Sequence, residues 1–408
     1  MSPRCSTLAN GLRVVLAPCE AESAAFGLFV ASGSRHESAK TAGISHFIEH
    51  MLFKGTPTRR PIDITRAIEG RGGNFNACTG EESTCYFAHL PDEYIGEAID
   101  ILSDMYLNAS IDAGELELEK GVVIDEIKMY DDEPDSVAAE NLQRALFPGS
   151  MLGAPVAGSE KTLRPMTPEM LKNYIASHYL PANTVAVVVG KFDEDEVAGR
   201  IEKNLGLRRS RRGGLKTDDP FRLPRVESVV AEREVKQTQL AIGYRTFGVG
   251  DSRRYAAAMM DAMLGRGMSS RLFQEVREKR GMSYDIASRL QFFSDAGMFV
   301  VTAGVDSKKA EAALKTIDRE LEKMRAKGVS AAELKRTKEY IAGNFKLSRE
   351  RTVSKLFFYG QAILSFGRIV TFEEQLEGFR SVSAADVKAV AEEILRPENR
   401  SVSRVVPK

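Results

Sequence analysis

Two stretches of the chain match each other at a fixed separation: TPEMLKNYIASHYLPAN, residues 167–183, and SAADVKAVAEEILRPEN, residues 383–399. Each begins with a residue that can cap a helix, Thr167 or Ser383, and continues with the apolar periodicity of a helix. Each then reaches a Pro-x-Asn step that leads into an apolar, strand-like run. Chance similarity between amphipathic helices is the alternative, but we interpret the match as an internal duplication.

The duplication extends beyond these stretches and predicts the domain organisation. At the same separation of 216 residues, positions 117–120 (ELEK) align with positions 333–336 (ELKR). A chain of 408 residues exceeds one ordinary core and suits two domains. Between Leu205 and Pro224 the sequence is basic, then Gly-Gly, then acidic, with hardly any apolar periodicity, which indicates a linker. We therefore expect two related domains at 1–206 and 225–408, joined by a linker at 207–224.

Periodicity predicts that each half mixes helices with hairpin-like strands. Strands are expected at 74–90 (as a hairpin), 237–246 and 287–305, and helices at 43–54, 62–70, 94–107, 112–129 and 308–327. Because the strands are joined by short turns, we predict antiparallel sheets with helices packed on them, which is an α+β fold class.

Composition excludes several classes of partner. Lys plus Arg equals Asp plus Glu, at 57 each, so no net charge favours nucleic acid or an anionic membrane. The four cysteines have neither the density nor the spacing of a disulfide scaffold or a Cys-type zinc site, which favours free thiols in a reducing compartment. The N-terminus is strand-like around an Asn10-Gly11 turn and does not look like a signal peptide. We expect a soluble, cytoplasmic protein.

A first chemical signal is His46-Phe-Ile-Glu49-His50, within GISHFIEHMLFKGT, residues 43–56. In a helix, residues i and i+4 share a face, so both imidazoles can converge on one ion with Glu49 beside them. The side chains around these three polar residues are apolar and predict a buried helix: Ile44, Phe47, Ile48, Met51 and Leu52. Imidazole is a good zinc ligand, and a carboxylate beside the metal can take a proton from water. The alternative is a pair of core histidines with local hydrogen-bond partners.

A catalytic zinc site usually takes three protein ligands, so the third should come from another element. Glu119 and Glu126 are seven residues apart and lie nearly on one face of the predicted helix. Val122, Val123 and Ile127 give Glu126 apolar surroundings, where a carboxylate needs a cation. Glu126 is therefore the best candidate for the third ligand.

The HxxEH motif resembles the inverted zinc motif of the inverzincins, the pitrilysin/insulinase family that includes mitochondrial processing peptidase. In that family the third ligand is a Glu well beyond the second His, and a Glu one helical repeat earlier supports the site. Glu126 lies 76 residues beyond His50, and Glu119 fills the earlier position. The resemblance, which covers essentially the whole chain, implies that His46, His50 and Glu126 hold Zn²⁺. It also implies that Glu49 activates water and that Glu119 orients the ligands.

The sequence GGNFNACTGEESTCYFAHL, residues 72–90, resembles the edge hairpin of the same family. In that family the hairpin's outer strand pairs with the substrate backbone, so the resemblance implies that Asn76 and Ala77 bind substrate. Strand addition of this kind needs an extended peptide.

In the second half, GRGMSSRLFQEVREKRGMSY, residues 265–284, is similar to a family segment that carries an Arg and, seven residues on, a Tyr. The resemblance implies catalytic roles for Arg277 and Tyr284. An Arg can hold a peptide carbonyl or carboxylate, and a Tyr hydroxyl can donate to the oxyanion that forms at the scissile carbonyl. Without the resemblance, Arg277 would be a surface salt-bridge partner and Tyr284 a half-buried strand aromatic.

The duplication predicts one metal site and not two. At the 216-residue separation, the positions that match the four metal-site residues of the first half are Ala262, Gly265, Arg266 and Ala342. None of these side chains is a usual zinc ligand. We therefore expect the second domain to bind no metal and to complete a substrate chamber.

These features predict a zinc-dependent endopeptidase that cleaves unfolded peptides or short protein segments by metal-activated water. Members of the family enclose substrate with four such domains, so the resemblance implies a homodimer of this two-domain chain. A catalytic member of a heterodimer with a paralogue is an open alternative. A non-catalytic assembly subunit, like the core proteins that the family contributes to respiratory complexes, is another, although all four metal-site positions are intact.

Overall fold

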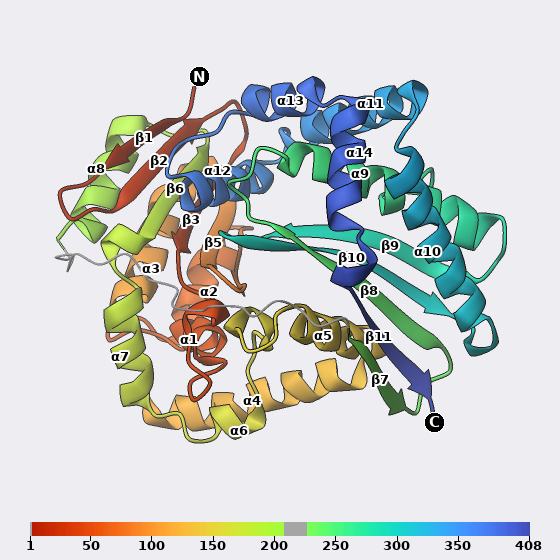
Figure 1. Cartoon of the computed structure of the whole chain (residues 1–408). Helices are drawn as coiled ribbons and strands as arrows, with labels where there is room; N and C mark the ends of the chain where they lie inside the picture. Colours follow the sequence, from red (N-terminus) through yellow and green to blue (C-terminus); the bar gives the residue numbers. More distant parts are fainter. Residues whose placement is uncertain (1, 208–226) are drawn as a thin grey trace. The chain divides into compact units, whose positions relative to one another are not determined.

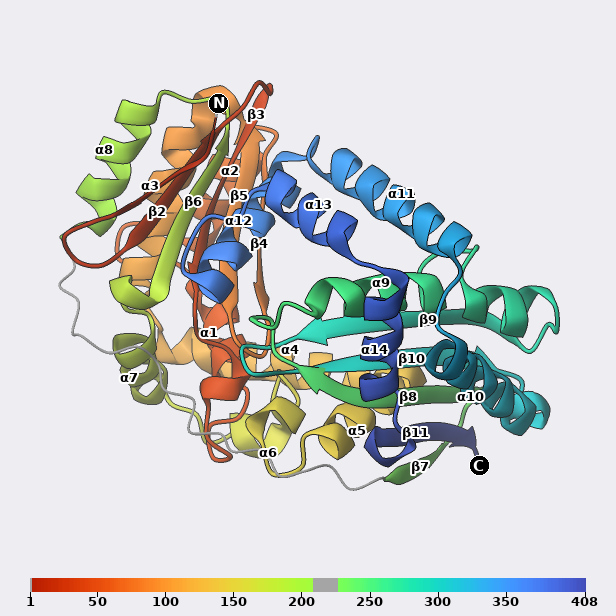
Figure 2. The same cartoon turned by 45° about the horizontal axis from the view of Figure 1, so that its top comes forward.

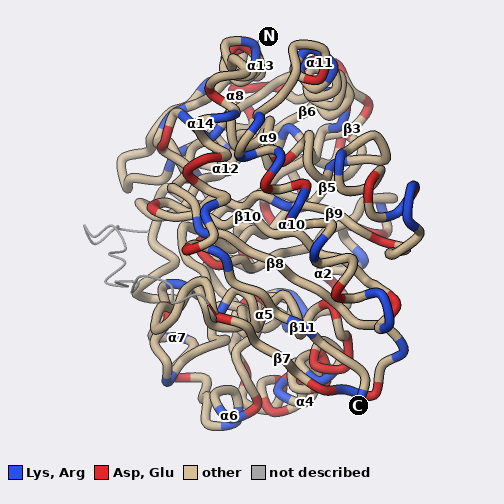
Figure 3. The backbone as a smooth tube through the Cα atoms, turned by 45° about the vertical axis from the view of Figure 1, so that its right-hand side comes forward, with Lys and Arg blue, Asp and Glu red and all other residues tan. Residues whose placement is uncertain are grey.

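The computed structural model describes residues 2–207 and 227–408 (Figure 1). It confirms the α+β class, because helices pack on two separate sheets. The predicted linker at 207–224 lies outside the described residues except for Leu207. Basic and acidic residues are interspersed along the chain, in keeping with their equal numbers (Figure 3). Within the described ranges, no helix is both long enough and apolar enough to cross a membrane.

The chain forms two compact units, and each takes in one segment from the opposite half of the sequence. The first unit comprises the described residues of Met1–Ile127, Ala154–Asp219 and Leu347–Val370. The second unit comprises the described residues of Lys128–Gly153, Pro220–Lys346 and Thr371–Lys408. The metal-site candidates of the first half therefore all lie in the first unit.

The sheet of the first unit has six strands in the order β1-β2-β6-β3-β5-β4. Its strands are β1 (Arg4–Thr7), β2 (Arg13–Pro18), β3 (Ser23–Val30), β4 (Asn74–Thr79), β5 (Thr84–Pro91) and β6 (Thr184–Gly190). Neighbouring strands run antiparallel as predicted, and the structure adds one parallel pair, β2 with β6. β4 is the edge strand, so its outer backbone is available to a further strand.

Helices cover both faces of this sheet, which explains the continuous apolar runs of β3 and β6. Along β3, Phe26 and Leu28 point into the larger core, while Phe29 points to the opposite face and contacts Phe357 of α12, with ring centroids 5.5 Å apart. The helices of the unit are α1 (Ile44–Leu52), α2 (Pro61–Glu69), α3 (Ile95–Asn108), α4 (Ala113–Asp132), α6 (Glu160–Leu163), α7 (Pro168–His178), α8 (Glu194–Leu205) and α12 (Thr352–Phe366). The last turns of α4 belong to the second unit.

The second unit repeats the same topology in five strands, ordered β7-β11-β8-β10-β9. Its strands are β7 (Ser228–Arg233), β8 (Thr238–Phe247), β9 (Ser283–Phe292), β10 (Ala296–Val305) and β11 (Arg400–Pro407). Again one pair is parallel, β7 with β11, at the place that β2 and β6 occupy in the first sheet. Its helices are α5 (Pro134–Leu146), α9 (Arg254–Gly265), α10 (Ala310–Lys327), α11 (Ala331–Ser348), α13 (Phe372–Ser381) and α14 (Ala384–Ile394). A π-helical turn, η5, spans Phe273–Glu278.

The two matching stretches, residues 167–183 and 383–399, occupy equivalent places in the two units. Thr167 caps α7 by accepting a hydrogen bond from the Met170 backbone N–H, and Ser383 caps α14 in the same way through Asp386. After each helix, a short 3₁₀ turn with the Pro-x-Asn sequence leads into β6 or β11. The internal duplication is therefore visible in element order, capping and strand pairing.

Each unit contains one helix that comes from the other half of the sequence. Helix α12 packs on β3 and β6 of the first sheet, and α5 packs on β8 and β11 of the second, as Figures 1 and 2 also show. A glycine makes room at each contact: a Cβ on Gly27 would lie 3.1 Å from Leu356 of α12, and one on Gly243 would lie 2.8 Å from Leu146 of α5. Gly27 and Gly243 are themselves 216 residues apart, so the duplicated halves share this packing device.

Candidate metal centre

Helix α1 carries the HxxEH motif and is fixed at its N-terminus by a buried carboxylate. The two oxygens of Glu37 accept hydrogen bonds from the backbone N–H groups of Gly43 and Ser45, each at 2.7 Å. Gly43 adopts φ 94°, a left-handed conformation that favours glycine, just before the helix begins. Acceptors at this end satisfy N–H donors that the helix leaves free.

The buried face of α1 agrees with the sequence prediction. Ile44, Phe47, Ile48, Met51 and Leu52 are all buried in the core of the first unit. The helix packs against β4 and β5, which form the edge hairpin.

Three side chains from α1 and α4 converge on one point. The Oε2 atom of Glu126 lies 3.4 Å from Nε2 of His50 and 3.8 Å from Nε2 of His46. One ligand atom from each residue lies within 4.8 Å of the others, and this is the single such trio among the described residues. Two ligands about 2.0–2.1 Å from a tetrahedral zinc ion are roughly 3.3 Å apart. The donor set and its spacing therefore fit zinc with little rearrangement.

Glu119, one helical repeat before Glu126, holds His50 from the other side. Its Oε1 atom lies 2.8 Å from Nδ1 of His50, and its Oε2 atom forms an ion pair with Lys54. A carboxylate at Nδ1 holds the proton there and leaves Nε2 free to bind a metal. In contrast, Nδ1 of His46 is buried without a hydrogen-bond partner among the described residues.

The electrostatic environment separates the two imidazoles. Burial lowers the pKa of His46, and the nearby His50 lowers it further. Burial also opposes charge on His50, but the hydrogen bond and negative charge of Glu119, with Glu126 and Glu49, outweigh it and raise the pKa of His50. Burial therefore favours the neutral form of His46, whereas the carboxylates around His50 favour its protonated form, and a metal at Nε2 of His50 competes with that proton.

Glu49 lies next to the three candidate ligands, but it accepts a hydrogen bond from the edge strand β4. Its Oε2 atom accepts a 2.5 Å hydrogen bond from the hydroxyl of Thr79 on β4. Burial raises the pKa of the Glu49 carboxyl, and the Thr79 hydrogen bond limits the rise. A carboxylate with a raised pKa suits proton transfer near neutral pH.

The hairpin residues expected to bind substrate lie on the edge strand. Asn76 is exposed on β4, Ala77 is half-buried against the core, and the Asn76 side chain accepts a hydrogen bond from the Ala77 N–H at 2.8 Å. Among the described strands, β4 has a neighbour on one side only, which is the geometry that strand addition requires. Substrate binding by these residues stays a prediction.

Arg277 and Tyr284 lie together in the second unit. The Arg277 guanidinium is 4.9 Å from the Tyr284 ring centroid and 4.7 Å from that of Phe273. Arg277 is part of the π-helical turn η5, and the Tyr284 residue, at the start of β9, is 78% exposed. Short π-helical segments are frequent at functional sites. The structure thus brings this pair together, while their catalytic roles stay predictions.

The second unit has an ion pair in the region that corresponds to the metal trio. Arg266, which aligns with His50, lies immediately after α9 and bonds through Nε to Asp261, whose carboxylate also accepts a 2.6 Å hydrogen bond from Ser288. Asp261 is fully buried, so this charge needs its partner. That the second half binds no metal stays a prediction.

Sequence reasoning missed three residues that support the site: Glu37, Lys54 and Thr79. A weak signal existed for Lys54, which is four residues after His50 and so on the same helical face. Thr79 is two residues after Ala77, which places both side chains on the core side of β4. A loop separates Glu37 from the helix, and no sequence pattern near Glu37 indicated its role at the N-terminus of the helix. One expectation was wrong in detail, because Val122 is 53% exposed and only Val123 is buried beside Glu126.

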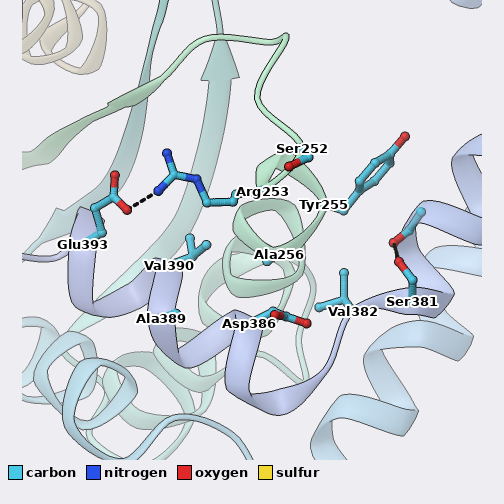
Figure 4. Close-up of a pocket in the computed structure, with 11 residues that line it drawn as sticks. Ser252, Arg253, Tyr255, Ala256, Ser381, Val382, Asp386, Ala389, Val390 and Glu393 are labelled. Carbon is cyan, nitrogen blue, oxygen red and sulfur yellow. Dashed lines mark hydrogen bonds and ion pairs between the residues drawn. The ribbon is translucent and has the colours of Figure 1, made fainter.

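A pocket of about 250 Å³ lies in the second unit between α9, α13 and α14 (Figure 4). Arg253 and Glu393 pair at one end, while Ala256, Val382 and Val390 supply apolar walls. None of the sequence-predicted site residues lines it.

A helix with HxxEH, completed by a carboxylate from a second helix, is the arrangement of inverted-motif zinc peptidases. Residues 13–160 match the family "Insulinase (Peptidase family M16)", and residues 165–341 match the "Peptidase M16 inactive domain". The chain belongs to the insulinase family, peptidase family M16, as the resemblance predicted.

Relatives of similar length carry names that agree with this family. "Uncharacterized zinc protease YmxG" of Bacillus subtilis is 34% identical over 95% of this chain and 94% of its own length. "Uncharacterized zinc protease Rv2782c" of Mycobacterium tuberculosis is 36% identical over 97% of this chain and 91% of its own. A protease from Helicobacter pylori of known structure has a TM-score of 0.95 at 21% identity, covering 100% of this chain and 99% of its own. That likeness shows the fold.

Proposed function

We propose that the protein is a zinc-dependent endopeptidase that cleaves unfolded peptides. The observation that carries the proposal is the convergence of His46, His50 and Glu126 on one point, with a separate carboxylate, Glu49, alongside. These four residues come from two helices, and Glu49 is held by Thr79 while His50 is held by Glu119, which matches the division of labour in a hydrolytic zinc site. The names of the relatives support the same chemistry.

In this proposal His46, His50 and Glu126 hold one Zn²⁺ ion through Nε2, Nε2 and a carboxylate oxygen. A bound zinc ion supplies a Lewis acid that polarises the scissile carbonyl and lowers the pKa of water. Glu119 keeps the proton of His50 on Nδ1, and Lys54 keeps Glu119 ionised and in place.

Glu49 moves the protons. A carboxylate oxygen of Glu49 takes a proton from the attacking water and later gives it to the leaving amide nitrogen. The raised pKa makes Glu49 a stronger base toward water than an ordinary carboxylate. Thr79, by donating to Oε2, fixes the orientation of the carboxylate.

The edge strand β4 supports an extended peptide as substrate. A peptide that pairs with β4 around Asn76 and Ala77 runs along the strand that also holds Thr79, and thus beside Glu49. We assign Arg277 and Tyr284 to the peptide carbonyl and the oxyanion, from their own chain or from a partner. We propose a homodimer, and a heterodimer with a paralogue is the alternative.

A Glu49→Gln variant tests this function. Gln keeps the size and helix fit but cannot take a proton, so zinc content and thermal stability should match the parent. Peptide cleavage should fall by ~10²–10⁴, the usual worth of a general base. Cleavage is scored by mass spectrometry on an unbiased peptide library, with Glu69→Gln, an exposed change on α2, as the matched control.

Equal cleavage by zinc-loaded Glu49→Gln and parent would refute the role of Glu49. A zinc-loaded parent that cleaves no peptide in the library would favour the non-catalytic assembly subunit. The two results separate a wrong mechanism from a wrong function.

A further inference from the structure

Two cysteines face each other across the edge hairpin of the first unit. Cys78 on β4 is the register partner of Cys85 on β5. Side chains at directly opposed positions of an antiparallel pair point to the same face, with Cβ atoms about 4.5–5.5 Å apart. A disulfide needs Cα atoms about 4.4–6.8 Å apart, a range that opposed residues meet, and a slightly closer Cβ approach. A small hairpin adjustment is enough to bridge them.

The two thiols differ in exposure and in hydrogen bonding. Cys78 is exposed, whereas Cys85 is 2% exposed. The thiol of Cys85 donates a hydrogen bond to Cys78 and thereby lowers the pKa of the Cys78 thiol. Burial raises the pKa of Cys85 well above its usual value. An accessible thiol with a lowered pKa beside a resolving cysteine is the pattern of oxidation-sensitive pairs.

The remaining cysteines lack this arrangement. Cys5 on β1 is exposed but lies opposite Val15, and burial raises the pKa of its thiol. Cys19 is half-buried after β2, where its N–H bonds to the Gly190 carbonyl. Cys5 is therefore an internal control for exposure without a partner.

We propose that Cys78 and Cys85 form a reversible oxidation site that takes a low-molecular-weight disulfide as co-substrate. The Cys78 thiolate attacks one sulfur of the small disulfide, forms a mixed disulfide and releases one small thiolate. Cys85 then loses its proton to the released small thiolate and attacks the sulfur of Cys78, which releases the second small thiolate. The two cysteines lose two electrons and two protons in total, and the small disulfide becomes two thiols.

The bond would tie the edge strand to its neighbour next to the catalytic candidate. Thr79, the residue after Cys78, donates to Glu49, while Cys78 points to the opposite face of the hairpin. The disulfide thus restrains β4 where the proposed substrate pairs, without entering the metal trio. A small thiol such as glutathione reverses the reaction.

Peptide mapping of the full chain tests the site. The parent protein is incubated with glutathione disulfide, alkylated and cut with a protease specific for Glu, which cleaves at Glu81 and Glu82 between the two cysteines. We expect a Cys78–Cys85 linked pair that disappears after reduction, with Cys5 free or carrying only glutathione. Cys85→Ala should instead trap glutathione on Cys78, and Cys78→Ala should leave Cys85 unmodified because it is buried.

Hydrogen exchange provides a second readout that needs neither zinc nor activity. Backbone amides of β4 should exchange more slowly in the oxidised parent than in the reduced parent, and equally in oxidised and reduced Cys78→Ala. Glutathione adducts on Cys78 without any linked pair would overturn the proposal, and so would equal reactivity of Cys78 and Cys5. A linked pair with unchanged exchange in β4 would overturn the proposed restraint.

Discussion

Removing the charge of Glu119 should weaken zinc binding, although Glu119 is not one of the three proposed zinc ligands. In the parent, Oε1 of Glu119 lies 2.8 Å from Nδ1 of His50. The Glu119→Gln side chain keeps an oxygen that can accept this hydrogen bond, but it loses the negative charge and the ion pair with Lys54. The side chain of Glu119 is only 7% exposed, so water screens this charge poorly.

The size of the effect follows from what Glu119 does to His50. Its hydrogen bond and charge, together with the charges of Glu126 and Glu49, outweigh the effect of burial and raise the pKa of His50, which means that they make the imidazole more basic. Loss of a partner of this kind typically weakens metal affinity 10- to 100-fold, or about 1.4–2.7 kcal/mol. We expect the zinc Kd of Glu119→Gln to rise by this factor at pH 7.

Competition with a chelator of known affinity measures the change. Glu117→Gln is the matched control, because Glu117 is on the same helix and also pairs with a lysine, but its side chain is 69% exposed. An unchanged Kd in Glu119→Gln, with a folded protein, would refute the role assigned to Glu119. An equal loss in both variants would point to a general effect on α4.

Three further predictions concern the surroundings of the site. Burial raises the pKa of Glu37 to about 7 in the folded protein. The protonated side chain therefore stabilises the fold fully below pH 4.5, and this stabilisation is lost as the pH rises through 7. Paired denaturant titrations measure the unfolding free energy of the parent and of Glu37→Gln. The parent value minus the variant value should fall by about 3 kcal/mol between pH 4.5 and pH 7. A difference that does not change with pH would contradict this prediction. Thr79→Val removes the donor to Glu49 and should move the acid limb of the pH–activity profile to higher pH, while Thr65→Val on α2 leaves it in place. Light scattering should give twice the chain mass of 44.9 kDa, and a fully active monomer would exclude the dimer.

The metal trio could be predicted because its information is local. His46 and His50 share a helical face by spacing alone, and Glu126 was selected by its helical relation to Glu119 and its apolar neighbours before the family resemblance supported it. The fold class and the duplication were equally accessible, since capping residues and Pro-x-Asn steps recur at one separation.

The helix exchange could not be predicted in this way. The apolar faces of α5 and α12 show that both helices are buried, but an amphipathic pattern does not say which sheet covers it. The contact depends on the space left by Gly27 and Gly243, which lie far from these helices in sequence. The parallel pairing of β2 with β6 is a similar case, because strands so far apart give no turn signal.

The supporting residues were missed for a related reason. Glu37 reaches the N-terminus of α1 across a loop, and Thr79 reaches Glu49 from a different element. Such partners are set by tertiary packing and carry no periodic signal. Lys54 was within reach of helical spacing, but a lysine at that position is equally typical of a solvated face.

Metal analysis of the parent and two ligand variants tests the central claim most directly. Zinc is measured by mass spectrometry after chelator-free purification, and folding is checked by circular dichroism. We predict about one zinc per chain in the parent, and a value near zero in His50→Ala and Glu126→Ala, because a two-ligand site binds zinc weakly. His89→Ala, which changes a histidine outside the trio, should keep its zinc. Equal zinc content in all four proteins, or no zinc in the parent, would contradict the account.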